Sequence, residues 1–482
     1  MSRAELWTLG AAELARLTRA GDITATEAVA SAFGRMDAVN PDLNAVVVDT
    51  RADAMARAAL LDTLPASDRG SLHGVPVTIK INVDQKGEAT SNGILAFKDL
   101  IAPADAPVVE NLLRAGAVVI GRTNTPEFSF RADTDNPLFG RTHNPWGRHI
   151  SAGGSSGGGG AAVMAGIGAL AHGNDIGGSL RFPASANGAV TVKPGLGRVP
   201  AWNPSQRSER GLLAQMMSVQ GLMCRTADDL AHAMPSLIAP DPRDPFHAPV
   251  PWHGAALGVP IKVAFTRNPH GYDLHPEVET ALLAARDALM DAGYVVEEVE
   301  PPNMFEIGRN GYRALMGEIA SLLKPDIDTY GSDTIKAMFN TYFQEFEPIT
   351  GDDLLRMMAK RSHYARAWAL FQQDYPLVLM PFLPHPFFAP DRDTEGVEGA
   401  HDVLGCAVYS YGMNFLGLPA GCLPTHLAHM PKGPQPINVQ IAAPRWREDL
   451  AVAAMQSIES RIPPVAKTLW SHMDSHSSQT NR

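Results

Sequence analysis

The strongest constraint on the fold of this chain is a segment of ten residues, 151–160, that contains six glycines and three serines. Glycine has no Cβ, so such a segment can turn sharply and lets the backbone approach a ligand closely. A second segment of this kind, Asp175-Ile-Gly-Gly-Ser179, follows it, and Ser179 lies 24 residues after Ser155. The two segments together form the candidate functional centre.

Two general motifs can be compared with the first segment. A phosphate-binding loop ends in Gly-Lys-Ser or Gly-Lys-Thr, and no lysine follows these glycines. Residues 153–157 match the Gly-x-Ser-x-Gly pattern of a nucleophile elbow, but that elbow requires a buried strand directly before it. Residues 145–149, Pro-Trp-Gly-Arg-His, do not have the pattern of such a strand. Both interpretations are therefore disfavoured.

Much of the remaining chain alternates between short strands and helices. Residues 75–81 and 117–121 are rich in β-branched residues, and a helical stretch at 105–115 separates them. Residues 261–299 repeat this strand, helix, strand order. The alternation predicts an α/β protein built on one sheet that helices cover.

Composition excludes several classes of protein. The net charge of −11 offers no basic surface for DNA or RNA, so no nucleic-acid partner is expected. The three cysteines have neither the Cys-x-x-Cys spacing nor a zinc-site spacing, and the histidines lack a His-Glu-x-x-His motif, so we expect no metal and no other cofactor. Signal-peptide patterns and apolar runs of 18 residues are missing, which predicts a cytoplasmic protein without a membrane segment.

Five further motifs accompany the two glycine-serine segments in a fixed order. They are GVPVTIK (74–80), GRTNTPEF (121–128), GLMCRTADDL (221–230), GLPAGCLP (417–424) and INVQIAAP (437–444). With these motifs the chain resembles the amidase signature family over nearly its whole length. The resemblance implies one amidase domain over residues 1–482, with its signature core at 65–240. It also implies a single large mixed β-sheet covered on both faces by helices.

The resemblance further implies catalysis by two serines and a lysine. Ser179 matches the nucleophile, Ser155 the bridging serine on a cis peptide bond, and Lys80 the base. A serine hydroxyl is a weak nucleophile at neutral pH, and a lysine amine can take its proton only when the amine is neutral. Lys80 lies within the mostly apolar stretch Val-Thr-Ile-Lys-Ile, where burial would lower the pKa of its amine. An acyl-enzyme at Ser179 is the expected intermediate, and a His-dependent hydrolase acting through Ser155 is the competing interpretation.

Other residues of the second segment acquire roles from the same resemblance. An oxyanion hole is expected from consecutive backbone N–H groups. These belong to Ile176, Gly177, Gly178 and Ser179. Ser156, Asp175 and Arg181 are expected to support the site through hydrogen bonds without acting in the chemistry.

Three residues depart from the family pattern. Ile81 follows the lysine where relatives commonly carry an acid, Arg122 replaces a frequent lysine, and Asn174 stands where threonine is frequent. None of these changes removes a member of the triad. Ile81, however, leaves open which groups hydrogen-bond the amine of Lys80.

The substrate is less constrained than the chemistry, because one fold serves many functions. Residues 305–388 carry 14 of the 33 aromatic residues, which either pack a helical layer or line a pocket for a bulky or aryl group. We expect region 301–400 to shape this pocket and the tail at 471–482 to be disordered. The predicted activity is hydrolysis of a small-molecule amide, anilide or carbamate, with esterase side activity, by a monomer or homodimer. Two alternatives stay open: an amidotransferase A-type subunit that releases ammonia from glutamine with partner subunits, and a catalytically silent scaffold.

Overall fold

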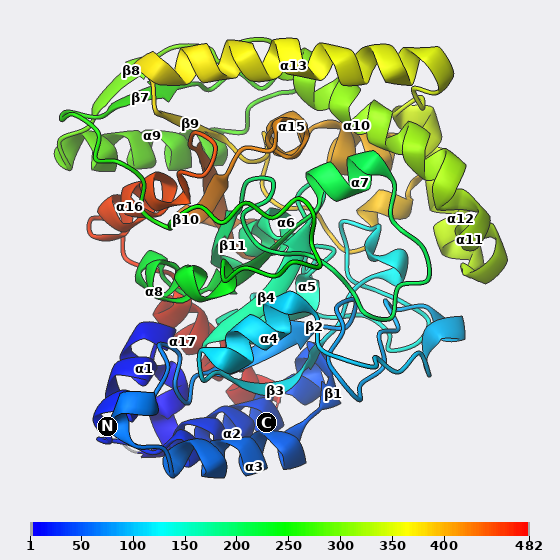
Figure 1. The fold of residues 1–482 in the computed structure, drawn as a ribbon. Coiled ribbons are helices and arrows are strands. Elements are labelled where there is room, and N and C mark those ends of the chain that lie inside the picture. The colour runs from blue at the N-terminus through cyan, green and yellow to red at the C-terminus, as the bar shows by residue number, and fades with distance from the viewer. Residues whose placement is uncertain (1–2, 481–482) are drawn as a thin grey trace.

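The structure is a computed structural model that describes residues 3–480. It is built on one mixed β-sheet (Figure 1). Its eleven strands lie in the order β1-β3-β2-β4-β6-β5-β10-β11-β9-β7-β8. They are β1 (Val46–Asp49), β2 (Pro76–Lys80), β3 (Val118–Thr123), β4 (Leu170–Asp175), β5 (Val190–Lys193), β6 (Val219–Cys224), β7 (Lys262–Phe265), β8 (Val295–Glu298), β9 (Leu377–Pro381), β10 (Ala420–Met430) and β11 (Gly433–Ala442). The predicted α/β fold class is confirmed.

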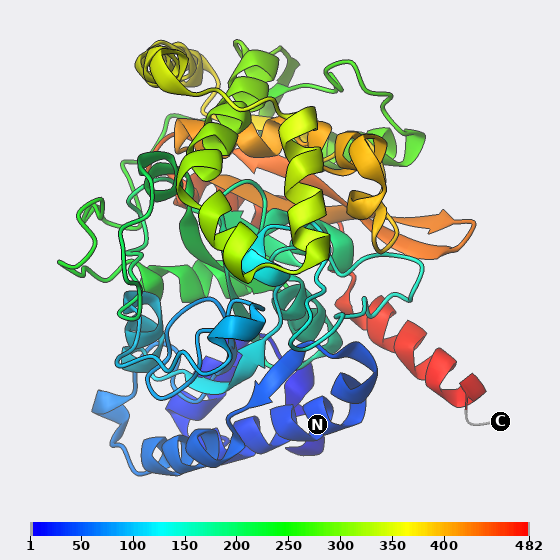
Figure 2. The same cartoon turned by 90° about the vertical axis from the view of Figure 1, so that its right-hand side faces the viewer.

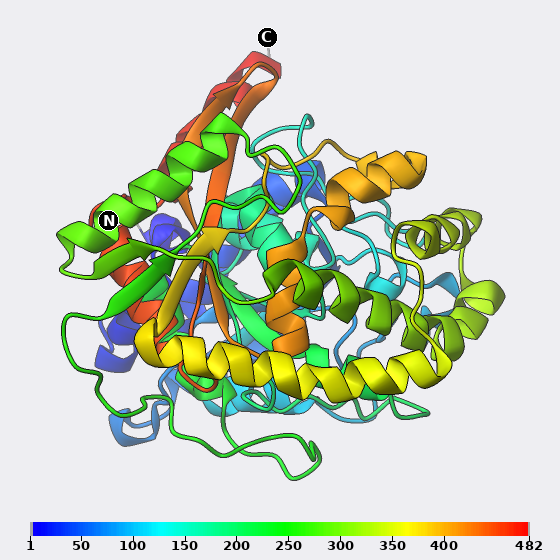
Figure 3. The same cartoon turned by 90° about the horizontal axis from the view of Figure 1, so that it is seen from above.

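Helices flank this sheet along its whole width (Figures 1 and 3). They are α1 (Ala11–Ala20), α2 (Ala25–Leu43), α3 (Arg51–Asp62), α4 (Pro107–Arg114), α5 (Gly157–Ala165), α6 (Arg181–Asn187), α7 (Leu212–Met217), α8 (Ala227–Leu237), α9 (Pro276–Asp291), α10 (Met304–Leu322), α11 (Lys324–Tyr330), α12 (Asp333–Glu345), α13 (Gly351–Asp374), α14 (Gly396–Ala400), α15 (Val408–Leu416), α16 (Glu448–Glu459) and α17 (Ala466–Thr480). None of the described helices combines the length and apolar character that crossing a bilayer requires.

Strand β9 shows why both faces of the sheet need cover. Its five residues are all buried. Leu377 and Leu379 belong to one hydrophobic cluster, whereas Val378 and Met380 belong to another. Alternate residues of a strand point to opposite faces, so the sheet has a hydrophobic core on each side.

The predicted strand, helix, strand units are present. β2 and β3 are parallel neighbours joined through α4, and β7 and β8 are parallel neighbours joined through α9. Pro76 is the first residue of β2, a position where its missing N–H is tolerated. β4 is also parallel to β2, β9 is parallel to β7, and the remaining pairs are antiparallel. The outer part of the β10–β11 hairpin projects past the other strands (Figures 2 and 3).

Helix α17 (Ala466–Thr480) covers part of the C-terminal tail, 471–482, for which the sequence predicts disorder. Helix α17 continues through residue 480, while residues 481–482 lie outside the described residues. Trp470 packs edge-on against Trp7, with ring centroids 4.9 Å apart, and donates its Nε1–H to the carbonyl oxygen of Met164 at 2.8 Å. Trp470, which directly precedes that tail, thus holds the start of the helix through partners distant in sequence.

Candidate active site

The candidate residues lie near the carboxyl ends of two parallel strands, on the side of the sheet where these strands end. Lys80 is the last residue of β2 and Asp175 is the last residue of β4, which runs parallel to β2. Ser155 precedes α5, and Ser179 precedes α6. Ligands of open α/β sheets commonly bind at this edge, because the loops that follow the strands meet there.

Close packing explains the glycines of the first segment. A Cβ on Gly154 would clash with the carbonyl oxygen of Arg131, and one on Gly158 would clash with the backbone nitrogen of Asn124. Both neighbours are backbone atoms, which cannot move aside as a flexible side chain could. The segment therefore needs glycine to lie against the rest of the site.

Lys80 and Ser155 form a buried pair. The Nζ atom of Lys80 lies 2.7 Å from the Oγ atom of Ser155, and both side chains are buried. Burial lowers the pKa of the Lys80 amine well below its ordinary value, and the carboxylate of Asp175 offsets only part of this effect. The peptide bond between Gly154 and Ser155 is cis. A neutral amine at this distance can accept the hydroxyl proton of Ser155.

Ser179 lies partly exposed on the same cavity as Ser155. This cavity, which we call the catalytic cavity, has a volume of about 250 Å³. A hydrogen bond between the hydroxyls of Ser179 and Ser155 is not found in the described structure. The N–H of Ser156 donates to the backbone carbonyl oxygen of Ser179 at 3.2 Å. The hydroxyl of Ser156 donates to the backbone carbonyl oxygen of Asn174 at 3.4 Å. These two bonds hold the glycine-serine segments side by side.

The four N–H groups expected to form an oxyanion hole are not equivalent. The N–H of Gly178 donates to Oδ1 of Asp175 at 2.7 Å. Among the described residues, no acceptor takes the N–H of Ile176, Gly177 or Ser179. Three donors are therefore available to a ligand, and the fourth fixes the loop.

Asp175 and Arg181 form a fully buried ion pair, with Nη2 of Arg181 2.9 Å from Oδ1 of Asp175. Burial alone would raise the pKa of the Asp175 carboxyl, but the Arg181 guanidinium outweighs this effect and lowers that pKa to about 2. Arg181 also donates to Gln440 of β11 at 2.8 Å, and Asn414 of α15 donates to Asp175 at 2.9 Å. The pair thus ties the loop that carries Ser179 to two distant elements.

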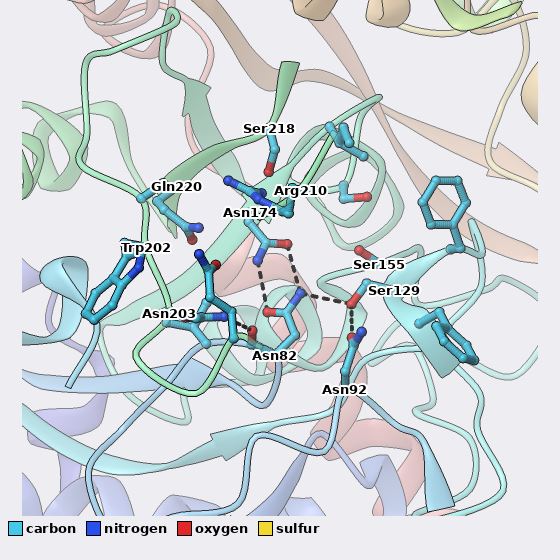
Figure 4. A pocket seen from close by; sticks show the side chains of 17 residues that line it. Asn82, Asn92, Ser129, Ser155, Asn174, Trp202, Asn203, Arg210, Ser218 and Gln220 are labelled. Atoms are coloured by element: carbon cyan, nitrogen blue, oxygen red, sulfur yellow. Dashed lines mark hydrogen bonds between the residues drawn. The ribbon is translucent and has the colours of Figure 1, made fainter. Parts of the chain in front are cut away.

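A pair of asparagine side chains, Asn82 and Asn174, adjoins the lysine, and the sequence did not reveal them as a unit. Figure 4 shows the two asparagines joined by a hydrogen bond. Lys80 Nζ lies 2.8 Å from Oδ1 of Asn174, and Nδ2 of Asn174 donates to Oδ1 of Asn82 at 2.9 Å. Nδ2 of Asn82 donates in turn to the hydroxyl of Ser129 at 2.9 Å. The side chain of Ile81 is buried in the core and, being apolar, supplies no hydrogen bond to the amine. Asn174 was visible in the sequence as a departure from pattern, whereas Asn82 carried no signal.

The catalytic cavity combines aromatic and polar walls. Its aromatic side chains are those of Phe128, Phe130 and Trp202. Trp202 belongs to the 194–211 loop, a segment between β5 and α7 that contains neither helix nor strand. Several polar side chains complete the lining, namely Asn82, Asn92, Ser129, Asn174, Asn203, Gln206, Arg210, Ser218 and Gln220.

The aromatic segment 305–388 contributes less to the cavities than to the core. Phe339, Tyr342 and Trp368 are fully buried in one hydrophobic cluster. In Figure 2 the yellow-green to yellow helices of this segment lie in the upper half of the view, away from the blue N-terminal helices at the bottom. Tyr312 of α10 is the member of the segment that lines a cavity beside Ser179 in the described structure, a small one of about 30 Å³.

Comparison with known proteins gives consistent matches. The family model described as Amidase matches residues 27–452. An indoleacetamide hydrolase of Bradyrhizobium diazoefficiens is 44% identical over 472 residues, which cover 97% of this chain and 89% of that protein. An acylamidase of Rhodococcus erythropolis is 32% identical over 479 residues, covering 96% and 97% of the two chains. The solved structure of a bacterial aryl acylamidase matches with a TM-score of 0.81 and 25% identity, over 96% of this chain and 98% of that chain.

Proposed function

This chain belongs to the amidase family and is a hydrolase of C–N amide bonds, and we propose that it hydrolyses a small arylacetamide to the acid and ammonia. The observation that carries the proposal is the buried Lys80–Ser155 pair, 2.7 Å apart, on the cavity that also exposes Ser179. The aromatic side chains of that cavity supply a surface for the aryl group.

In the proposed mechanism, protons pass along the two serines to the lysine. Neutral Lys80 takes the proton of Ser155, Ser155 takes that of Ser179, and Ser179 Oγ attacks the amide carbonyl carbon. Ser155 then returns a proton to the leaving nitrogen as the C–N bond breaks, which leaves an acyl-enzyme ester at Ser179. Water attacks this ester with the same groups as base and acid, and the carboxylic acid leaves.

Negative charge on the carbonyl oxygen is stabilised by the free backbone donors. We assign this role to the N–H groups of Ile176, Gly177 and Ser179, because none of them has an acceptor within the described chain. Gly178 donates to Asp175 instead, so it holds the loop in place. This narrows the four-donor oxyanion hole expected from the sequence to three donors.

The size and lining of the catalytic cavity support a small aromatic substrate. Its volume of about 250 Å³ lies just below the usual range for ligand pockets, roughly 300–1,000 Å³. Phe128, Phe130 and Trp202 can pack against an aromatic ring. The relative named indoleacetamide hydrolase, at 44% identity, points to the same class of amide. Anilides, carbamates and esters present a similar carbonyl to Ser179, so we expect them as secondary substrates.

The test compares ammonia release from indole-3-acetamide and phenylacetamide by the wild type, Ser179→Ala and the control Ser67→Ala, whose serine is exposed and does not line the cavity. We expect Ser179→Ala to lose at least about a thousandfold in kcat with its circular dichroism unchanged, and Ser67→Ala to match the wild type. Full activity of Ser179→Ala would overturn the assignment of the nucleophile. Turnover of glutamine, with neither arylacetamide hydrolysed, would overturn the proposed substrate and favour the amidotransferase-type alternative.

A further inference from the structure

Arg210 is the charged residue among the described residues that line the catalytic cavity. It stands at the end of the 194–211 loop, two residues before α7 begins. Figure 4 shows its side chain among those that surround the cavity, together with Ser218 and Gln220. The remaining lining residues are neutral, and no carboxylate is among them.

Arg210 has no counterion within the described chain. No ion pair and no hydrogen bond of its guanidinium to another described residue is found. Three carboxylates lie close enough to act on it electrostatically, those of Glu209, Asp244 and Glu318. Each of them accepts hydrogen bonds from other groups.

The hydrogen bonds of these three carboxylates go to groups other than Arg210. Glu318 accepts the N–H groups of residues 213 and 214 at the start of α7. Asp244 accepts the N–H of Ala201 at 2.8 Å, and Glu209 accepts the side-chain amide of Gln206 at 3.1 Å. The positive charge beside the cavity is therefore not neutralised by direct contact.

The surroundings of Arg210 differ from those of an ordinary surface arginine. Much of its side chain is exposed, because the catalytic cavity and an adjacent cavity of about 390 Å³ both reach it. Partial desolvation by the surrounding protein lowers the pKa of this guanidinium, and the nearby carboxylates offset only part of that effect. An arginine without a counterion on the wall of a cavity can bind a carboxylate through two parallel charge-assisted hydrogen bonds.

We propose that Arg210 binds an anionic group of the substrate, so that this enzyme prefers an aryl amide that carries a carboxylate in addition to the scissile amide. Gln206, Ser218 and Gln220 line the same cavity and offer further hydrogen bonds to that carboxylate. This inference rests on the proposed function, because it adds a second recognition element to the same cavity. It separates this chain from an enzyme whose substrate is a neutral arylacetamide.

The experiment uses pairs of substrates that match in shape and differ in charge. Ortho-, meta- and para-carboxyphenylacetamide are compared with the corresponding nitrophenylacetamides, since a nitro group has the shape of a carboxylate without its charge. For at least one isomer, we expect the wild type to show a kcat/KM about tenfold higher for the carboxylate than for the nitro compound. Arg210→Gln should abolish this preference, by lowering kcat/KM for the carboxylate compound about tenfold more than for the nitro compound.

Arg207→Gln is the matched control, because Arg207 is an exposed arginine of the same loop that does not line the cavity. It should keep the wild-type preference. Equal rates of the wild type on all three pairs would overturn the proposal. So would an Arg210→Gln variant that slows carboxylate and nitro compounds equally, because that result indicates a structural role.

Binding to the Ser179→Ala variant separates this inference from the proposed function. Calorimetry should show tighter binding of the carboxylate compound than of its nitro partner, and loss of the difference in the double variant with Arg210→Gln. That result supports the anion site even if the wild type hydrolyses none of these amides, in which case the proposed function alone fails. Equal binding of both compounds would overturn the anion site.

Discussion

At the scale of single residues, the burial of Lys80 sets the pH dependence of the enzyme. The amine acts as a base only when neutral, and its pKa lies well below the ordinary value because the side chain is buried. We predict that kcat/KM falls as the pH is lowered through this pKa and that Lys80→Met loses activity at every pH. Initial rates across a pH series measure both effects, with the exposed Lys432→Met as control. Constant activity down to about pH 5 would contradict a lysine base.

The contact between Lys80 and Asn174 gives a second prediction at this scale. Asn174→Leu removes an oxygen that lies 2.8 Å from the amine. Because that oxygen stabilises the protonated form, its loss should lower the pKa of Lys80 and move the acid limb of the kcat/KM profile to lower pH. The maximal kcat should fall about tenfold, since the amine is no longer oriented. Asn174→Thr, which keeps a hydroxyl acceptor, should retain more activity; identical profiles for all three proteins would count against this role.

At the scale of elements, the buried Asp175–Arg181 pair joins the loop before α6 to β11 and α15. Arg181→Met would leave the Asp175 carboxylate buried without its partner, which is expected to lower the free energy of unfolding by about 3–5 kcal/mol. Urea denaturation at neutral pH measures the change. Lys324→Met is the control, because its pair with Asp328 lies on the surface and should contribute less than about 1 kcal/mol. Similar losses of unfolding free energy in both variants would contradict the larger contribution that we assign to the buried pair.

Elements also differ in how far the sequence predicts them. Buried parallel strands are rich in β-branched residues, so both strand, helix, strand units could be predicted from local pattern. The family resemblance carried by the motifs also predicted that Lys80 and Ser155 belong to one site. Asn82 and Arg210 could not be found in this way, because they lie outside helices and strands and their roles depend on which cavity the fold forms around them. The contacts of Trp470 in helix α17 could not be predicted for a related reason, since its partners lie far away in the sequence.

At the scale of the whole molecule, the β10–β11 hairpin joins the two halves of the open sheet. β10 pairs with β5, and β11 pairs with β9, so the hairpin lies between the two ends of the sheet. We predict that a chain ending after Leu416, which lacks both strands, aggregates because apolar strand faces stay uncovered. A chain ending after Ile462 keeps every strand and should remain soluble. Solubility on expression and resistance to protease compare the two; a folded monomer from the shorter chain would refute the prediction.

The separation between the catalytic groups and the 194–211 loop has a consequence for evolution and engineering. Trp202 and Arg210 belong to a segment that contributes no strand to the sheet and no hydrogen bond to Lys80, Ser155 or Ser179 within the described structure. Substitutions in this loop can therefore change which amides are accepted while the chemical machinery stays intact. New specificities can thus arise from a few surface mutations, and libraries for altered substrate scope should concentrate their diversity there.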